Sequence, residues 1–182
     1  EPGINIRLTK TMKTTLVKNR SWLFKAFFAL LLTFGGNVQA AGSLDMQIER
    51  TILKALKDYN TAMNSDDVSK WIKYFEKNAV RSDPLSSPAE GIDNITKYYQ
   101  QEFSHFSANI NVKKVMLKER TGAVEMIWIA KDKKTSKTLS VPMTGIFELA
   151  PSGKFQTATF YFDTSMNNDE QQKFLLDQLT IK

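Results

Sequence analysis

Cysteine is absent from this sequence, histidine occurs once, and the 182 residues include five prolines and eight glycines. Without cysteine, the chain has neither disulfide bonds nor thiolate chemistry. The single histidine, His105, argues against a histidine-based metal site, because such sites use several imidazole ligands. We therefore expect no metal and no cofactor, and we expect His105 to be a residue at the end of a helix.

A hydrophobic run long enough to span a membrane permanently is also lacking near the N-terminus. Residues 26–34 are apolar, which is short for a hydrocarbon core of about 30 Å. A basic stretch precedes this run, and small residues follow it at Val38 and Ala40. This order is typical of a signal peptide. We expect residues 1–40 to be an upstream segment and signal peptide, cleaved near Ala40, with no permanent membrane span afterwards. An uncleaved membrane anchor is the alternative.

The positive charge of the chain lies mostly in this leader. The whole sequence has 25 basic and 19 acidic residues, and residues 1–40 hold six of the basic ones and one of the acidic ones. Residues 41–182 therefore carry 19 basic and 18 acidic residues, a net charge of +1. Nucleic-acid binding requires clustered positive charge on the folded part, so we expect no nucleic-acid partner. The expected location is periplasmic or secreted.

Helical patterns come first in residues 41–182, whose length fits a single domain. One apolar face recurs at helical spacing along the first segment, at Ile48, Ile52, Leu56, Tyr59 and Met63. The polar residues 64–67 break this helix. A second apolar stripe runs through residues 68–75. A third begins after Gly91 and ends at Phe106.

Strand patterns dominate the second half. Residues 110–118 are a weak candidate, and residues 124–130, 141–149 and 155–163 are stronger ones. Residues 151–153 have the composition of a hairpin turn. A short terminal helix is expected after Asn167. Helices followed by hairpin strands predict an α+β domain with a curved, mainly antiparallel sheet wrapped over three N-terminal helices, and therefore a concave pocket.

Particular residues accompany this order of elements: Tyr59, the 64–67 break, Trp71 to Phe75, Asn78-Ala79-Val80, Asp83-Pro84, Gly91 with Ile95, and Gly153-Lys154. Together they resemble the NTF2-like superfamily, which includes SnoaL-like polyketide cyclases and steroid delta-isomerases. The resemblance extends from about residue 48 to residue 163. It implies a cone-shaped α+β barrel with an apolar pocket.

The isomerases of this superfamily suggest candidate catalytic residues. In that family an aspartate before a proline moves a proton, while a tyrosine and a protonated acid stabilise the oxyanion. The resemblance places Asp83 at the base position and Tyr59 at the tyrosine position. A carboxylate at the mouth of an apolar pocket has a raised pKa, so we expect a raised pKa for Asp83. Gly145 stands where the second acid belongs, so half of the oxyanion hole is predicted to be missing. Asp83 as an ordinary turn residue and Tyr59 as a core residue are the alternatives.

Further residues are predicted to line the pocket and bind the ligand. They are Trp71, Tyr99, Phe103, Met126, Trp128, Met143, Tyr161 and Asp163. Core packing is the alternative for the two residues of the 126–128 strand.

Two functions remain open from the sequence. The first is an exported domain that binds a small apolar molecule and uses Asp83 and Tyr59 for isomerase-like, cyclase-like or hydrolytic chemistry. The second is a non-catalytic module that forms a homodimer or binds a protein partner through its outer sheet face and terminal helix. An inward Asp83 near Tyr59 in an open pocket would favour the first.

Overall fold

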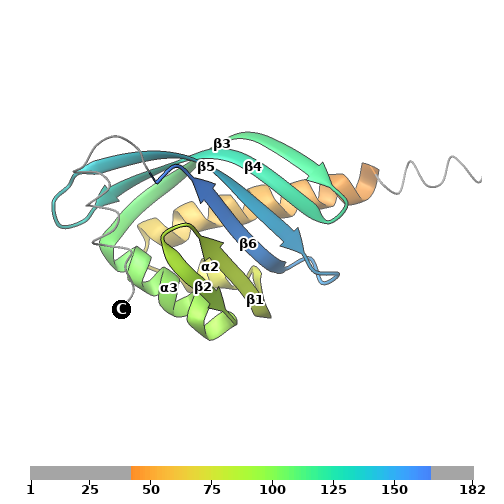
Figure 1. Ribbon diagram of the computed structural model, residues 1–182, viewed down its shortest axis with the longest axis horizontal. Helices are drawn as coiled ribbons and strands as arrows, with labels where there is room; N and C mark the ends of the chain where they lie inside the picture. The colour runs from red at the N-terminus through yellow and green to blue at the C-terminus, as the bar shows by residue number, and fades with distance from the viewer. Residues whose placement is uncertain (1–41, 165–182) are drawn as a thin grey trace, which may run out of the picture. The chain divides into compact units, whose positions relative to one another are not determined.

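The computed structural model describes residues 42–164, and it has an α+β fold as the sequence predicts (Figure 1). A long helix over residues 42–64 comes first. It is followed by α2 (Ser69–Ile72), β1 (Phe75–Asp83), β2 (Ser86–Glu90), α3 (Ile92–His105), β3 (Phe106–Lys118), β4 (Thr121–Asp132), β5 (Thr138–Leu149) and β6 (Phe155–Phe162). No helix within residues 42–164 is long and apolar enough to cross a membrane.

The long helix buries the predicted face. All five residues of its apolar stripe are at most 3% exposed, which confirms the expected period. The helix ends where the polar residues begin, and Asp66 adopts a positive φ of 52° in the turn that follows. Asp67 then accepts hydrogen bonds from the backbone N–H of Ser69 (3.2 Å) and from its hydroxyl.

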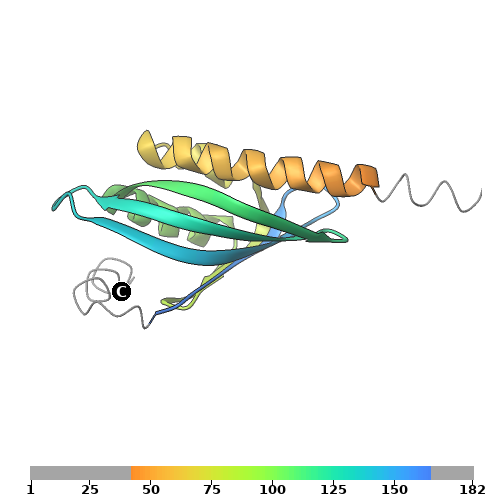
Figure 2. The ribbon, with the colours of Figure 1, turned by 90° about the horizontal axis from the view of Figure 1, so that it is seen from above.

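Six strands form one sheet in the order β2-β1-β6-β5-β4-β3. Every neighbouring pair is antiparallel except β1 and β6, which run parallel. Irregularities interrupt the register in β1 and in β3, and such bulges bend a strand. Figure 2 shows the resulting curved sheet, with β3, β4 and β5 running beside the long helix. The mainly antiparallel sheet is therefore confirmed.

Two local predictions in the first half were wrong. The second stripe forms only the four-residue helix α2, because Phe75 already begins β1. The β1–β2 hairpin lies between α2 and α3, whereas the sequence indicated helices alone before the sheet. Its inward positions include Arg81, a charged residue, so the strand lacks the usual apolar alternation.

Strands β3, β4 and β5 are longer than their apolar patterns, while β6 ends one residue before its predicted end. The weak candidate at residues 110–118 is part of the 13-residue edge strand β3, and the turn at residues 151–153 joins β5 to β6. His105 is the last residue of α3, as expected. The predicted terminal helix after Asn167 lies outside the described residues.

Candidate functional site

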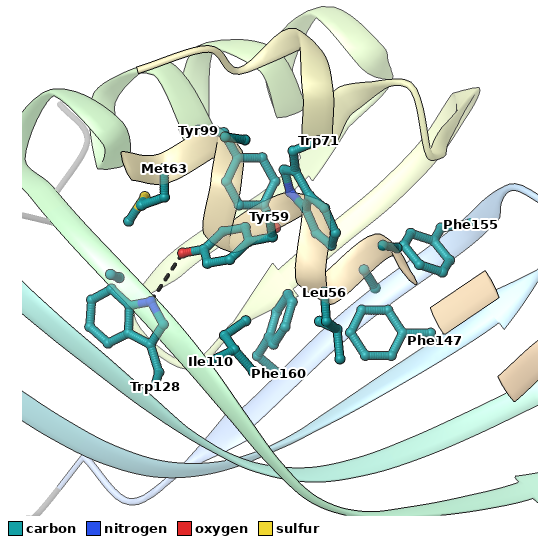
Figure 3. Close-up of a cluster of buried hydrophobic side chains, with 14 of the residues drawn as sticks. Leu56, Tyr59, Met63, Trp71, Tyr99, Ile110, Trp128, Phe147, Phe155 and Phe160 are labelled. Atoms are coloured by element: carbon teal, nitrogen blue, oxygen red, sulfur yellow. Dashed lines mark hydrogen bonds between the residues drawn. The ribbon is translucent and has the colours of Figure 1, made fainter. Parts of the chain in front are cut away.

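A cavity opens between the long helix, α2, α3 and the inner face of the sheet. The space is about 570 Å³ when the open solvent at its mouth is counted, and about 50 Å³ of it can hold the centre of a water molecule. Most of its wall is apolar or aromatic, and Figure 3 shows several of these rings pointing toward one another. The lining residues are Leu56, Tyr59, Trp71, Arg81, Asp83, Tyr98, Tyr99, Glu102, Ile110, Trp128, Val141, Met143, Phe160 and Phe162.

Strand β1 places a buried cation in this cavity. Arg81 and Asp83 are two residues apart, so they point to the same face of the strand. The Arg81 side chain is only 7% exposed, and its guanidinium carbon lies 3.6 Å from the centroid of the Tyr98 ring. Arg81 donates to the Asp83 carboxylate and, at 3.4 Å, to the Ser86 hydroxyl. A buried cation is costly unless it is paired, and Asp83 supplies the paired charge.

The Asp83 carboxylate accepts five hydrogen bonds. One oxygen accepts from the backbone N–H groups of Leu85 (2.6 Å) and Ser86 (2.9 Å) and from the Ser86 hydroxyl (3.2 Å). The other accepts from Arg81 and from the Tyr98 hydroxyl (3.0 Å). Burial alone would raise the pKa of Asp83, but the Arg81 charge and these hydrogen bonds outweigh it and hold the pKa below the usual 3.8. The expected raised pKa of Asp83 is therefore wrong.

Helix α3 brings a second carboxyl group into the cavity. Glu102 lies three residues after Tyr99 and four after Tyr98, on the same helical face, and is 7% exposed. Burial raises the pKa of Glu102, and the nearby Arg81 charge and the hydrogen bond from Tyr59 offset this only in part. The Tyr59 hydroxyl donates to Glu102 Oε1.

Tyr59 lines the cavity, but its hydroxyl is hydrogen-bonded to Trp128 and Glu102 rather than to Asp83. Its hydroxyl accepts a hydrogen bond from Trp128 Nε1 at 3.0 Å (Figure 3). The same hydroxyl donates to Glu102. The contacts of Asp83 instead come from β1, the β1–β2 turn and Tyr98. The two predicted catalytic residues thus share one cavity without a hydrogen bond to each other.

The predicted vacancy at Gly145 is filled by packing. A Cβ atom placed on Gly145 would lie 2.6 Å from the Met126 Cε atom and 2.9 Å from the Phe147 ring. A carboxyl side chain therefore has no room at this position unless these side chains move. The cavity nevertheless contains a second carboxyl group, which comes from Glu102 on α3 rather than from a strand.

The predicted ligand-binding residues divide into three groups. Trp71, Tyr99, Trp128 and Met143 line the cavity. Phe103 and Met126 are core residues, 2% and 1% exposed, and do not line it. Tyr161 and Asp163 are exposed, because the inward residues of this segment are Phe160 and Phe162. The prediction therefore placed the wrong set of alternating residues in the cavity.

Arg81, Tyr98 and Glu102 are the polar lining residues that the sequence analysis missed. A signal for Glu102 was present, because it is the one carboxyl residue among the apolar positions of the α3 face at Ile95, Tyr99 and Phe103. Arg81 gave a weaker signal, an arginine two residues before the candidate aspartate. Within residues 42–164, no group of three or more metal-ligating side chains is placed to hold a metal ion.

The sequence model of the SnoaL-like domain matches residues 56–156, which is more than half of the chain. The chain belongs to the SnoaL-like domain family. The matched segment contains all the lining residues of the cavity except those at the end of β6. A comparison with curated protein sequences found no match for this SnoaL-like domain.

Solved structures with the same fold include proteins of several activities. A candidate SnoaL-like polyketide cyclase from Jannaschia sp. CCS1 has a TM-score of 0.59 and 14% identity, over 76% of this chain and 96% of that one. The epoxide hydrolase/cyclase-like enzyme SalBIII, described in pyran ring formation in salinomycin, has a TM-score of 0.55 and 16% identity, over 64% and 94% of the two chains. An LEH-like epoxide hydrolase from M. tuberculosis has a TM-score of 0.53 and 12% identity, over 63% and 84%.

Proposed function

We propose that this SnoaL-like domain binds a small, mainly apolar molecule in its cavity and transfers a proton on it, as an isomerase, cyclase or epoxide hydrolase does. One observation carries the proposal. Asp83 and Glu102 lie in one cavity around Arg81, and their surroundings shift their pKa values in opposite directions. Carboxyl groups whose pKa values are driven apart in this way serve as acid and base in several enzymes.

Glu102 is the group that holds a proton in this proposal. Its carboxyl is buried among aromatic rings and keeps its proton to a higher pH than an exposed glutamate. It can therefore donate that proton to a ligand oxygen, with Tyr59 beside it. Asp83 stays ionised and is the proposed base, although five hydrogen bonds make it a weak one.

The solved relatives support this class of chemistry. They include a candidate polyketide cyclase and two proteins of the epoxide hydrolase type. At identities of 16% or less, these structures support the scaffold, while the choice of reaction rests on the cavity itself.

Two assays of the full chain test the proposal. The first follows conversion of 3-cyclohexenone to 2-cyclohexenone by absorbance, a reaction that removes one proton beside the carbonyl and adds one at the γ carbon. The second measures diol formation from cyclohexene oxide. In whichever assay shows turnover, we expect Glu102→Gln and Asp83→Asn each to lower the rate by about 10²–10⁴-fold, the usual contribution of a general acid or base.

Glu125→Gln is the matched control, because Glu125 is an exposed carboxyl residue on β4 outside the cavity. Wild-type rates in both cavity variants would contradict the acid–base roles. Absence of turnover with either substrate would favour the alternative of a non-catalytic module that forms a homodimer or binds a protein partner.

We also propose that the domain is exported. The basic stretch, the short apolar run and the small residues at Val38 and Ala40 support a cleaved leader. The periplasm and the extracellular medium are both consistent with this.

A further inference from the structure

The Tyr98 hydroxyl lies between the two carboxyl groups of the cavity. It donates a hydrogen bond to Asp83 Oδ2 at 3.0 Å. Tyr98 and Glu102 are four residues apart on α3, which places their side chains one turn apart on the same face, and they share a hydrogen bond. Asp83 on β1 and Glu102 on α3 are therefore joined through a single hydroxyl group.

Tyr98 is held in this place by the residues around it. It is 4% exposed, and the Arg81 guanidinium carbon lies 3.6 Å from the centroid of its ring. Its ring also packs edge-on against that of Tyr99, with the two centroids 5.3 Å apart. The Asp83 side chain is 2% exposed and Glu102 is 7% exposed, so both ends of the connection are shielded from bulk water.

A buried tyrosine hydroxyl can pass a proton on without becoming charged. It has one O–H group that donates and two lone pairs that accept. Burial raises the pKa of Tyr98 well above its usual value, and the Arg81 charge opposes this only in part. The hydroxyl therefore gives up its own proton only as it receives another one.

We propose that Tyr98 relays a proton between Asp83 and Glu102 and so resets the cavity after it has opened an epoxide. The relay rests on the proposed function and adds a third residue to it. In the opening step, Asp83 takes a proton from water as the water oxygen bonds to a ring carbon. The bond from that carbon to the epoxide oxygen breaks, and this oxygen takes the Glu102 proton. The diol leaves with Asp83 protonated and Glu102 ionised, which is the reverse of the starting state.

The relay reverses this exchange of charge. Asp83 gives its proton to the Tyr98 oxygen as Tyr98 gives its own proton to the Glu102 carboxylate. Tyr98 gains one proton and loses one, so its charge does not change, and the negative charge returns from Glu102 to Asp83. This direction is favoured, because Arg81 and the backbone N–H groups of the β1–β2 turn stabilise the Asp83 anion, whereas burial disfavours an ionised Glu102.

Diol formation from cyclohexene oxide by the full chain tests the relay when it is followed from the first turnover by rapid quench. Tyr98→Phe removes the hydroxyl and keeps the ring on which Arg81 stacks. We expect its first turnover to be close in rate to that of wild type, because Glu102 starts protonated. Later turnovers should be slower by about 10²-fold, the lower part of the range for a positioned proton-transfer group. They should quicken as pH falls from 8 to 6, because Glu102 then takes its proton from solvent. Wild type should show no such burst.

Two further variants accompany Tyr98→Phe. Glu102→Asp keeps the acid but draws its carboxyl group back from Tyr98, so we expect a burst in this variant as well. Tyr99→Phe is the matched control. It removes the neighbouring hydroxyl of α3, which hydrogen-bonds with Trp71 and Arg81 instead, and it should change the first and the later turnovers by the same factor.

A constant rate in both Tyr98→Phe and Glu102→Asp overturns the relay. An equal loss of the first and the later turnovers in Tyr98→Phe, with urea unfolding showing a folded chain, overturns it too. If Glu102→Gln and Asp83→Asn still abolish turnover in either case, the proposed function stands without the relay. Absence of diol formation by wild type overturns the relay, and absence of 3-cyclohexenone isomerisation as well overturns the proposed function with it.

Discussion

At the scale of single residues, the cavity is organised by one buried arginine. Arg81 is paired with Asp83 and is stacked on Tyr98, and its charge reaches Glu102 on the neighbouring helix. The charge acts on both carboxyl groups, but they differ in burial and in hydrogen bonds. Asp83 has enough donors to stay ionised, whereas the burial of Glu102 outweighs the charge. The pKa values of the two groups therefore shift in opposite directions.

The titration of Glu102 gives a prediction for stability. A carboxyl whose folded pKa lies above its usual value of 4.5 stabilises the fold fully below that pH and loses this contribution as pH rises through the folded pKa. We therefore expect the free energy of unfolding of wild type, minus that of Glu102→Gln, to fall by about 1.4 kcal/mol per pH unit above 4.5 until Glu102 ionises. Urea unfolding at a series of pH values measures this difference.

Subtracting the two curves cancels the titration of the other groups, including Asp83, whose lowered pKa has the opposite effect and acts below pH 3.8. A difference that stays constant between pH 4 and 8 would show that Glu102 titrates normally. It would also remove the main support for Glu102 as the acid.

At the scale of elements, Asn60 fixes the long helix to the open edge of the sheet. Strand β3 is an edge strand, so half of its backbone groups lack a strand partner. The Asn60 side chain accepts from the Ile110 N–H (2.7 Å) and donates to the Ile110 carbonyl (3.3 Å). This contact positions the helix that carries Tyr59 relative to the strand that carries Ile110, and both residues line the cavity.

We expect Asn60→Ala to lower the free energy of unfolding by about 1–3 kcal/mol, because it leaves the backbone groups of Ile110 without partners. Asn94→Ala is the control. Asn94 also donates to a backbone carbonyl, that of Glu90 (2.8 Å), but it is exposed, so water replaces the lost bond. Urea unfolding measures both, and equal effects for the two variants would contradict the edge role of Asn60.

Elements differed in how well their sequence predicted them. A regular pattern of buried apolar residues made some elements predictable, namely the long helix, α3 and strands β4 to β6. Strand β1 was missed because an inward arginine interrupts its apolar pattern. Helix α2 was overestimated because Phe75 continues the helical spacing of Trp71 although it starts a strand.

At the scale of the whole molecule, the leader gives a prediction about the mature chain. When the full sequence is expressed in a bacterium with a general secretion pathway, we expect N-terminal sequencing of the periplasmic or medium fraction to begin at Ala41. Replacing the small residue Ala40 by a bulky one should block this cleavage. Recovery of the uncleaved chain from the membrane fraction would instead favour the anchor, and recovery from the cytoplasm would contradict export.

The order of the residues is enough to identify the family, the α+β class, the helical face that carries Tyr59 and the presence of Asp83 in the cavity. These features depend on how the residues are spaced along the chain. The lowered pKa of Asp83 and the place of Glu102 in the cavity depend on contacts that form only when the chain folds. A pKa depends on burial and on the charges nearby, and here Arg81 from β1 meets Glu102 from α3, 21 residues away, only after folding.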